Sequence, residues 1–117
     1  MPTFSAAYAS ANNPYNIFNV ISGAQTTGVT KRTGVATQPA ASRNYSRLSI
    51  MVDDSVAGNI YLTSGGPPAS VTNLVGEKIP SGDSKLLAGE GNMRAISLAD
   101  KSFAVDTTGM IIHITYE

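Results

Sequence analysis

Short runs in which apolar and polar residues alternate recur along this chain, and glycine, proline, aspartate and asparagine separate them. In the clearest run, residues 47–52, Leu48, Ile50 and Val52 share one face, while Ser49 and Met51 share the other. Side chains of a strand point alternately to opposite faces, so such runs predict half-buried strands. Helical spacing is nearly absent. About seven to eight such strands, roughly 8 to 15 residues apart, predict an all-β fold, either an antiparallel β-sandwich or a jelly-roll-like barrel.

Residues 43–66, with the sequence RNYSRLSIMVDDSVAGNIYLTSGG, predict two strands joined by an acidic turn. Asp53-Asp54 and Gly58-Asn59 are turn signals, and Ile60 and Leu62 resume the alternation, so we expect a β-hairpin. Residues 69–84 fit a helix, a strand or a loop, and residues 93–98 alternate again. The last run predicts a strand with two distinct faces, one of Ile112, Ile114 and Tyr116, the other of Ile111, His113 and Thr115.

Composition excludes several classes of function. The chain has 117 residues, enough for one domain, and its 42% hydrophobic content suffices for a core. Its formal net charge is zero, so we expect no nucleic-acid partner. There is no cysteine, which excludes disulfides and thiolate zinc sites. The first residues lack the features of a signal peptide and no apolar run approaches about 18 residues, so we expect no membrane partner.

Residues that could carry catalysis or bind metal lack the partners that such chemistry needs. His113 is the single histidine, and we expect a half-exposed residue of the last strand. Asp53-Asp54 lacks the ligand pattern of a calcium loop and fits a solvated turn. Three further carboxylates in the glycine-rich second half fit ordinary surface residues better than a glycosidase pair: Glu77, Asp83 and Glu90. We therefore expect no enzyme activity, no cofactor and no metal site.

The first 30 residues contain no charged side chain, and Lys31 is the first. An uncharged segment with spaced aromatic residues is more easily explained if it lies against another surface, although a mobile terminus is the alternative. We divide the chain into an extended N-terminal arm with a first strand, residues 1–22, and a β-sandwich domain, residues 23–117. In the arm, residues 15–22 predict a strand. The candidate residues for contact with the capsid or a sister subunit are Phe4, Tyr8, Tyr15, Ile17 and Phe18.

The run RLSIMVDDSVAGNIYLTSGG, followed by KLLAGEG and a closing apolar strand, resembles the layout of small virion proteins of tailed bacteriophages. Leu48 and Ile50 match the first strand of that layout, residues 60–62 the second, and residues 87–90 the bend. The resemblance covers about the C-terminal two thirds of the chain, while the N-terminal third departs from it. It implies a jelly-roll-like β-sandwich that serves as a head decoration (cement) protein. Such a protein binds the major capsid protein on the virion surface, after assembly in the host cytoplasm.

Repeated attachment around a shell favours cyclic symmetry, so we expect a homo-oligomer, specifically a trimer. Two alternatives remain open. The chain could be a component of a phage tail or head fibre. It could also be a carbohydrate-binding or receptor-binding module that uses the loop at residues 65–70, with Tyr61 as a stacking residue, although the absence of tryptophan counts against sugar binding.

Overall fold

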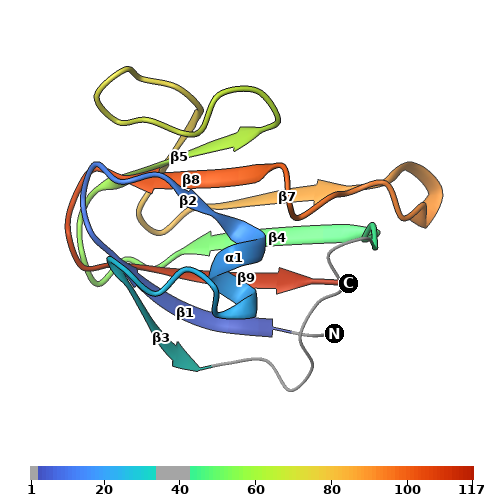
Figure 1. The fold of residues 1–117 in the computed structure, drawn as a ribbon, viewed down its shortest axis with the longest axis horizontal. Helices are drawn as coiled ribbons and strands as arrows, with labels where there is room; N and C mark the ends of the chain where they lie inside the picture. Colours follow the sequence, from blue (N-terminus) through green and yellow to red (C-terminus); the bar gives the residue numbers. More distant parts are fainter. Residues whose placement is uncertain (1–2, 34–42) are drawn as a thin grey trace.

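The computed structural model describes residues 3–33 and 43–117 (Figure 1). The predicted sandwich domain, residues 23–117, therefore includes a stretch, 34–42, that lies outside the described residues, as do residues 1–2. The elements of the described ranges are β1 (Thr3–Ala9), β2 (Tyr15–Asn16), α1 (Ile17–Ser22), β3 (Val29–Thr33), β4 (Arg47–Val52), β5 (Asn59–Ser64), β6 (Glu77–Pro80), β7 (Ser84–Ala88), the 3₁₀ helix η1 (Glu90–Asn92), β8 (Lys101–Val105) and β9 (Met110–Tyr116).

The strands form two antiparallel sheets. One has five strands in the order β3-β1-β9-β4-β7, and the other has four in the order β2-β8-β5-β6. Every pairing between named strands of the described residues is antiparallel. The predicted all-β sandwich is confirmed, with nine strands in the described ranges, and the sheets do not close into a barrel.

The two faces predicted for the clearest strands are confirmed. Leu48, Ile50 and Val52 of β4 are buried, whereas Met51 of the same strand is exposed. The core also receives the predicted inward face of β9, which is Ile112, Ile114 and Tyr116, and Ile60, Leu62, Phe103 and Val105 from the four-stranded sheet. One hydrophobic cluster therefore fills the space between the two sheets, as the alternation requires.

The prediction of a hairpin between residues 47–52 and 59–63 is wrong. β4 pairs with β7 and β9, while β5 pairs with β6 and β8 in the other sheet. The N–H of Asp53 donates to the carbonyl of Ile111 at 2.9 Å, so the pairing with β9 continues past the end of β4. The chain then enters the second sheet at Asn59, whose N–H and side-chain amide both donate to the Asp106 carboxylate.

The prediction of a strand over residues 15–22 is wrong beyond Asn16, because Ile17–Ser22 forms the helix α1. The Asn16 side chain accepts the N–H of Asn19 at 3.0 Å and so caps the first turn. Gly23 ends the helix at a φ of +89°, a conformation that glycine adopts without steric cost. Ile17, Val20 and Ile21 follow helical spacing, and all three side chains are buried in the core.

β1 does not stand apart from the sandwich. It lies between β3 and β9 in the five-stranded sheet, and Phe4 and Ala7 are buried in the core of the same chain (Figure 1). The register of β1 shifts between Phe4 and Ala7, as in a β-bulge. Residues 3–22 are thus integral to the fold that the sequence assigned to residues 23–117.

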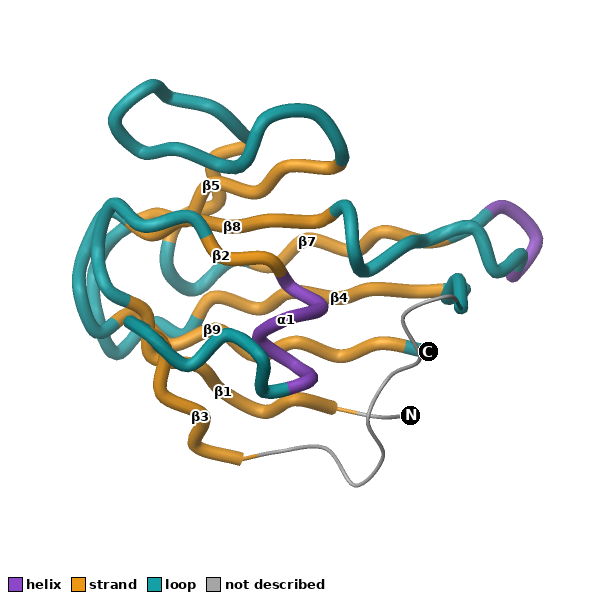
Figure 2. The backbone as a smooth tube through the Cα atoms, viewed as in Figure 1, coloured by secondary structure: helices purple, strands orange, loops and turns teal. Residues whose placement is uncertain are grey.

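The segment between β5 and β6 extends beyond β5, where Figure 2 draws it in teal. Ala69 of this segment is buried in a second small cluster with Tyr61 and Ala104, and Val71 packs against them. Because Tyr61 and Ala104 alternate with core residues along their strands, this cluster lies on the outer face of the four-stranded sheet. The strand predicted for residues 93–98 reduces to an isolated bridge between Tyr45 and Ile96.

Candidate functional site

The five residues predicted to contact another protein separate into two groups. Phe4, Tyr15 and Ile17 are at most 1% exposed in the core of their own chain, and Phe18 is half-buried against the same core. Tyr8 differs, since it alternates with the buried Ala7 and Ala9 and therefore lies on the outer face of the five-stranded sheet. Contact with a capsid or a sister subunit stays a prediction, and Tyr8 is the residue of the five that such a contact reaches most directly.

Tyr15 holds the N-terminal segment to the rest of the molecule. Its hydroxyl donates to the carbonyl of Gly28 at 2.9 Å and accepts the N–H of Ser10 at 3.0 Å. Its ring lies 5.3 Å from the ring of Phe103, centroid to centroid, within the usual range of aromatic pairs. Both the aromatic ring and the polar group of Tyr15 therefore have partners inside the chain.

An apolar stripe crosses the outer face of the five-stranded sheet and consists of Tyr8, Ile111, Met51 and Leu86. Tyr8 of β1 pairs directly with Ile111 of β9. The β4 registers place Met51 opposite His113 and Ser84, so that Ile111 and Leu86 are its diagonal neighbours on the two adjoining strands. Met51 and Leu86 are each 54% exposed. Four strands thus each place one apolar side chain on this face, of which Met51 and Leu86 are exposed while Ile111 is only 7% exposed.

Met51, Leu86 and Ile111 are not among the contact residues predicted from the sequence. The signal for Met51 was present, because the alternation of residues 47–52 assigned it to the face opposite the core. That Leu86 lies next to it could not be found in this way, because β4 and β7 are separated by more than 30 residues and become neighbours only in the folded sheet.

His113 lies on the outward face of β9, as predicted, with one third of its side chain exposed. Its Nε2 lies 3.1 Å from Oδ2 of Asp53, a partner that sequence reasoning missed. The hydrogen bond from His113 is the largest cause that lowers the pKa of Asp53 to about 2, and hydrogen bonds from the Ser55 side chain and N–H lower it further. The Asp53-Asp54 turn therefore anchors a connection between sheets.

Among the described residues, no group of His, Cys, Asp or Glu could hold a metal ion.

We expect the Asp53 carboxylate to make the stability of the protein pH-dependent in acid. A carboxyl with a lowered pKa in the folded state stabilises it fully above its usual pKa of 3.8, and this contribution is lost as the pH falls toward about 2. The Asp53→Asn variant should therefore be less stable than wild type at pH 5, and the difference should shrink between pH 4 and 2. Urea midpoints measured at each pH test this. Asp54→Asn, at the exposed neighbouring position, is the control, and a difference that does not change with pH would contradict the assignment.

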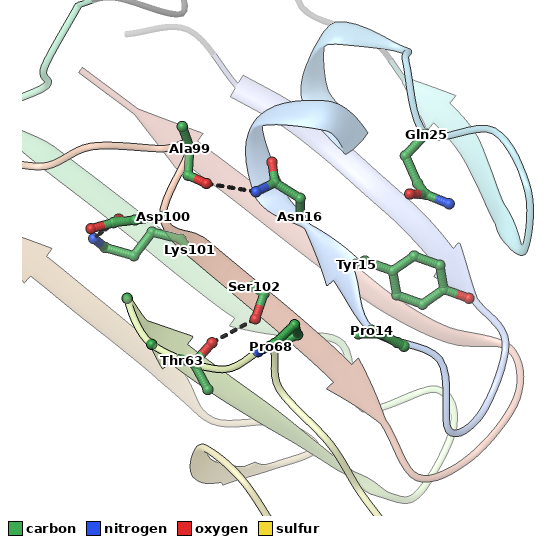
Figure 3. A pocket seen from close by; sticks show the side chains of 12 residues that line it. Pro14, Tyr15, Asn16, Gln25, Thr63, Pro68, Ala99, Asp100, Lys101 and Ser102 are labelled. Atoms are coloured by element: carbon green, nitrogen blue, oxygen red, sulfur yellow. Dashed lines mark hydrogen bonds and ion pairs between the residues drawn. The ribbon is translucent and has the colours of Figure 1, made fainter.

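A pocket of about 370 Å³ opens where the start of β8, the end of β5 and the junction of β2 with α1 meet (Figure 3). The side-chain amide of Asn16 donates to the carbonyl of Ala99 at 2.6 Å across one side. On the other side the hydroxyls of Thr63 and Ser102 are 2.5 Å apart, and the Ser102 oxygen also accepts the N–H of Ala69 at 2.8 Å. The volume falls within the range of about 300–1,000 Å³ that is common for ligand pockets.

The polar side chains of this pocket already form hydrogen bonds or ion pairs within the chain. Lys101 is buried, and its ammonium donates to the carboxylate of Asp100. Within residues 3–33 and 43–117, every buried side-chain nitrogen and oxygen has a hydrogen-bond partner. Ser102 contacts Thr63 and a main-chain N–H, neither of which can act as a general base for it. Ser102 therefore has no general base beside it that would activate it as a nucleophile.

The carboxylates of the second half of the chain have ordinary surface positions. Glu77 of β6 pairs with Lys85 of β7 at 3.3 Å, and Asp83 and Glu90 are exposed. Within the described part of the chain, no helix has the length and apolar character needed to span a membrane.

Comparisons with known proteins give no family. No protein-family model matches the chain, and no curated protein matches it significantly. Two solved structures are similar over 99% of this chain and 83% of their own, with 11% identity in both cases. They are a coat protein dimer of Tobacco streak virus, with a TM-score of 0.43, and the same coat protein in another crystal form, with a TM-score of 0.41. Similarity at this level is too low to assign a family or a function.

Proposed function

We propose that this protein is a non-enzymatic structural component of a virion, and that it decorates the head of a tailed bacteriophage. In this role it binds the shell of the major capsid protein and stabilises it. The resemblance of the C-terminal two thirds of the chain to small phage virion proteins supports the proposal. The engaged polar groups of the pocket also fit a protein without catalysis.

The observation that carries the proposal is the difference between the two outer faces of the sandwich. The outer face of the four-stranded sheet has an apolar cluster that the protein covers with its own segment, because Ala69 and Val71 pack on Tyr61 and Ala104. The outer face of the five-stranded sheet carries the apolar stripe, and Met51 and Leu86 in it remain half-exposed. An exposed apolar patch with a polar surround is typical of a surface that binds another protein.

The chemistry of this face suits attachment to a protein shell. Tyrosine and methionine are enriched at protein interfaces, and the stripe contains one of each, Tyr8 at one end and Met51 near the middle. Around them lie residues that can form polar contacts at a rim, including Ser49, Thr115 and the Asp53–His113 pair. Tyr8 belongs to the stripe and to the residues predicted from the sequence, so the N-terminal strand contributes to the proposed contact.

A co-sedimentation experiment tests the proposal. Empty shells are assembled from the major capsid protein encoded in the same genome as this chain, and the purified protein is added before a density gradient. We expect the wild-type protein to move with the shells. A charge in the middle of the stripe, as in Met51→Glu, should weaken this binding about tenfold or more, because an unpaired carboxylate would be buried in the contact.

Leu74→Glu is the matched control, because Leu74 is 71% exposed and lies in the segment over the other sheet. It should bind shells as the wild type does, and circular dichroism should show that both variants are folded. Wild-type protein that stays at the top of the gradient, or a Met51→Glu variant that binds with unchanged affinity, would overturn the proposal. Co-migration with tails rather than heads would favour a tail or fibre component instead.

A ligand-binding module is the second candidate function, because the pocket is lined in part by Gly65, Gly66 and Pro68 of the loop that the sequence suggested for it. However, Tyr61, the residue predicted to stack on a ligand, is not accessible for this role. Tyr61 is only 9% exposed and lies under Ala69. With its polar side chains engaged, the pocket gives this candidate less support than the exposed stripe gives to shell binding.

A further inference from the structure

β7 forms one edge of the five-stranded sheet, and only β4 pairs with it among the described residues. The N–H of Gly89 donates to the main-chain carbonyl of Ser46, and the N–H of Val52 donates to the main-chain carbonyl of Asp83, both at 2.9 Å. In an antiparallel ladder, hydrogen-bonded and non-hydrogen-bonded pairs alternate, so Lys85 and Leu87 direct their main-chain groups toward β4. The N–H and C=O groups of Ser84, Leu86 and Ala88 therefore point to the open side.

β7 is the least protected of the four sheet edges in the described residues. Proteins commonly protect an edge strand with charges, with proline or by making it very short. β3 contains Lys31 and Arg32, β6 contains two charged residues and ends at Pro80, and β2 has two residues. β7 contains one charge, Lys85, and its ammonium pairs with Glu77 of β6. Leu86, in the middle of β7, is exposed on the outer face.

We propose that β7 pairs with β7 of a second copy of this chain, antiparallel, about a two-fold axis at Leu86. In this register Leu86 lies opposite the second copy's Leu86, and Ser84 lies opposite the second copy's Ala88. These are the residues whose main-chain groups point to the open side, so each pair can exchange both of its hydrogen bonds. The two five-stranded sheets become one continuous sheet across the axis.

Side-chain chemistry is compatible with this register. Each charged residue of the segment from 82 to 90 falls opposite an uncharged one: Asp83 opposite Gly89, Lys85 opposite Leu87, and Glu90 opposite Gly82. No like charges meet. The two copies of Leu86 lie side by side on the outer face, and Met51 of each copy is a diagonal neighbour of its own Leu86. Pairing therefore covers apolar surface as well as main-chain groups.

The inference does not require shell binding, although Leu86 belongs to both proposed contacts, and it specifies a symmetry. An edge that pairs with itself is used once per copy and closes at two chains. It therefore predicts a dimer, whereas the trimer predicted from the sequence rested on the symmetry of a shell. The dimer should form in the purified protein without any capsid protein present.

Light scattering after size exclusion, over a series of protein concentrations, tests the inference. We expect the wild type to have twice the chain mass of 12.1 kDa. Leu86→Pro should have the mass of one chain, because it removes the central N–H donor of the new pairing. The pairing of β7 with β4 does not use that N–H, so the variant should keep the wild-type circular dichroism spectrum. Leu86→Lys brings two like charges together at the axis and should also be monomeric. This variant replaces Leu86→Pro in the experiment if the proline variant does not fold.

A cysteine probe tests the register directly, because the chain contains no cysteine of its own. Across a hydrogen-bonded antiparallel pair the Cα atoms are about 5.5 Å apart, within the range that a disulfide spans. Leu86→Cys should therefore form a covalent dimer under mild oxidation. Met93→Cys, at a position that is 64% exposed and outside β7, should do so far more slowly.

A wild-type protein that is monomeric at all concentrations, a mass of three chains, or a Leu86→Pro variant that remains dimeric would overturn the inference. These outcomes are separate from those of the shell experiment. A dimer that does not bind shells would support the pairing of β7 and contradict the proposed function. A monomer that binds shells would do the opposite.

Discussion

A variant that lacks residues 1–22 is expected to be unfolded. Five large side chains of this segment are at most 2% exposed in the core, beside the smaller Ala7 and Ala9: Phe4, Tyr15, Ile17, Val20 and Ile21. At about 1.5–3 kcal/mol for each buried side chain, their loss removes roughly 7–15 kcal/mol. The net stability of a domain is itself only about 5–15 kcal/mol. The deletion also leaves β9 with an unpaired edge on the side where β1 lay.

Circular dichroism and urea unfolding measure this result, and two point variants in the full-length chain serve as controls. Phe4→Ala should lower the free energy of unfolding by about 3–5 kcal/mol, because it leaves a cavity in the core. Tyr8→Ala, on the same strand but on the outer face, should cost much less. A deletion variant with a near-UV spectrum and a cooperative transition like those of wild type would instead support a separable N-terminal arm.

Phe103→Ala is expected to lower the free energy of unfolding by about 3–5 kcal/mol, at the upper end of single core substitutions. Phe103 is fully buried in the middle of β8, and its strand neighbours on the two sides are Tyr15 and Leu62. Its ring packs against the ring of Tyr15, so the substitution also loosens the residue that holds the N-terminal segment. Linear extrapolation of urea unfolding gives the difference in free energy.

Met51→Ala is the matched control for this substitution, since it also truncates a large apolar side chain, at a half-exposed position on the outer face. It should change the free energy of unfolding by about 0.5 kcal/mol or less. A loss below about 1 kcal/mol for Phe103→Ala would show that Phe103 does not fill the core as the structure has it.

Local patterns predicted the faces of individual strands correctly. In β4 and β9 the alternation separated core residues such as Ile50 and Ile114 from outward residues such as Met51 and His113. It failed at residues 17–22, where β-branched and aromatic residues suggested a strand. There the Asn16 cap, the terminal Gly23 and the spacing of the buried residues produce a helix. In such short apolar runs, the two periods are difficult to distinguish.

The candidate site was less accessible to sequence reasoning than the fold. The absence of charge before Lys31 was interpreted as a sign of an external contact, but most of the large apolar side chains of that segment pack in its own core. Burial within the same chain also removes the need for charge. The stripe and the β7 edge are formed by residues from strands that are distant in sequence, and no local pattern joins Tyr8 to Met51 or Leu86.

The sequence by itself determined that the chain folds as an all-β sandwich and which side of the clearest strands faces the core. The reason is that a strand's period of two is a local property, set by each run of residues. Only the tertiary structure decided which strands pair, and it placed β4 and β5, which are consecutive in sequence, in different sheets. Pairing depends on how distant strands share a common core and use each other's edges. For the same reason, which apolar residues remain uncovered, and which edge remains open, became visible only in the folded molecule.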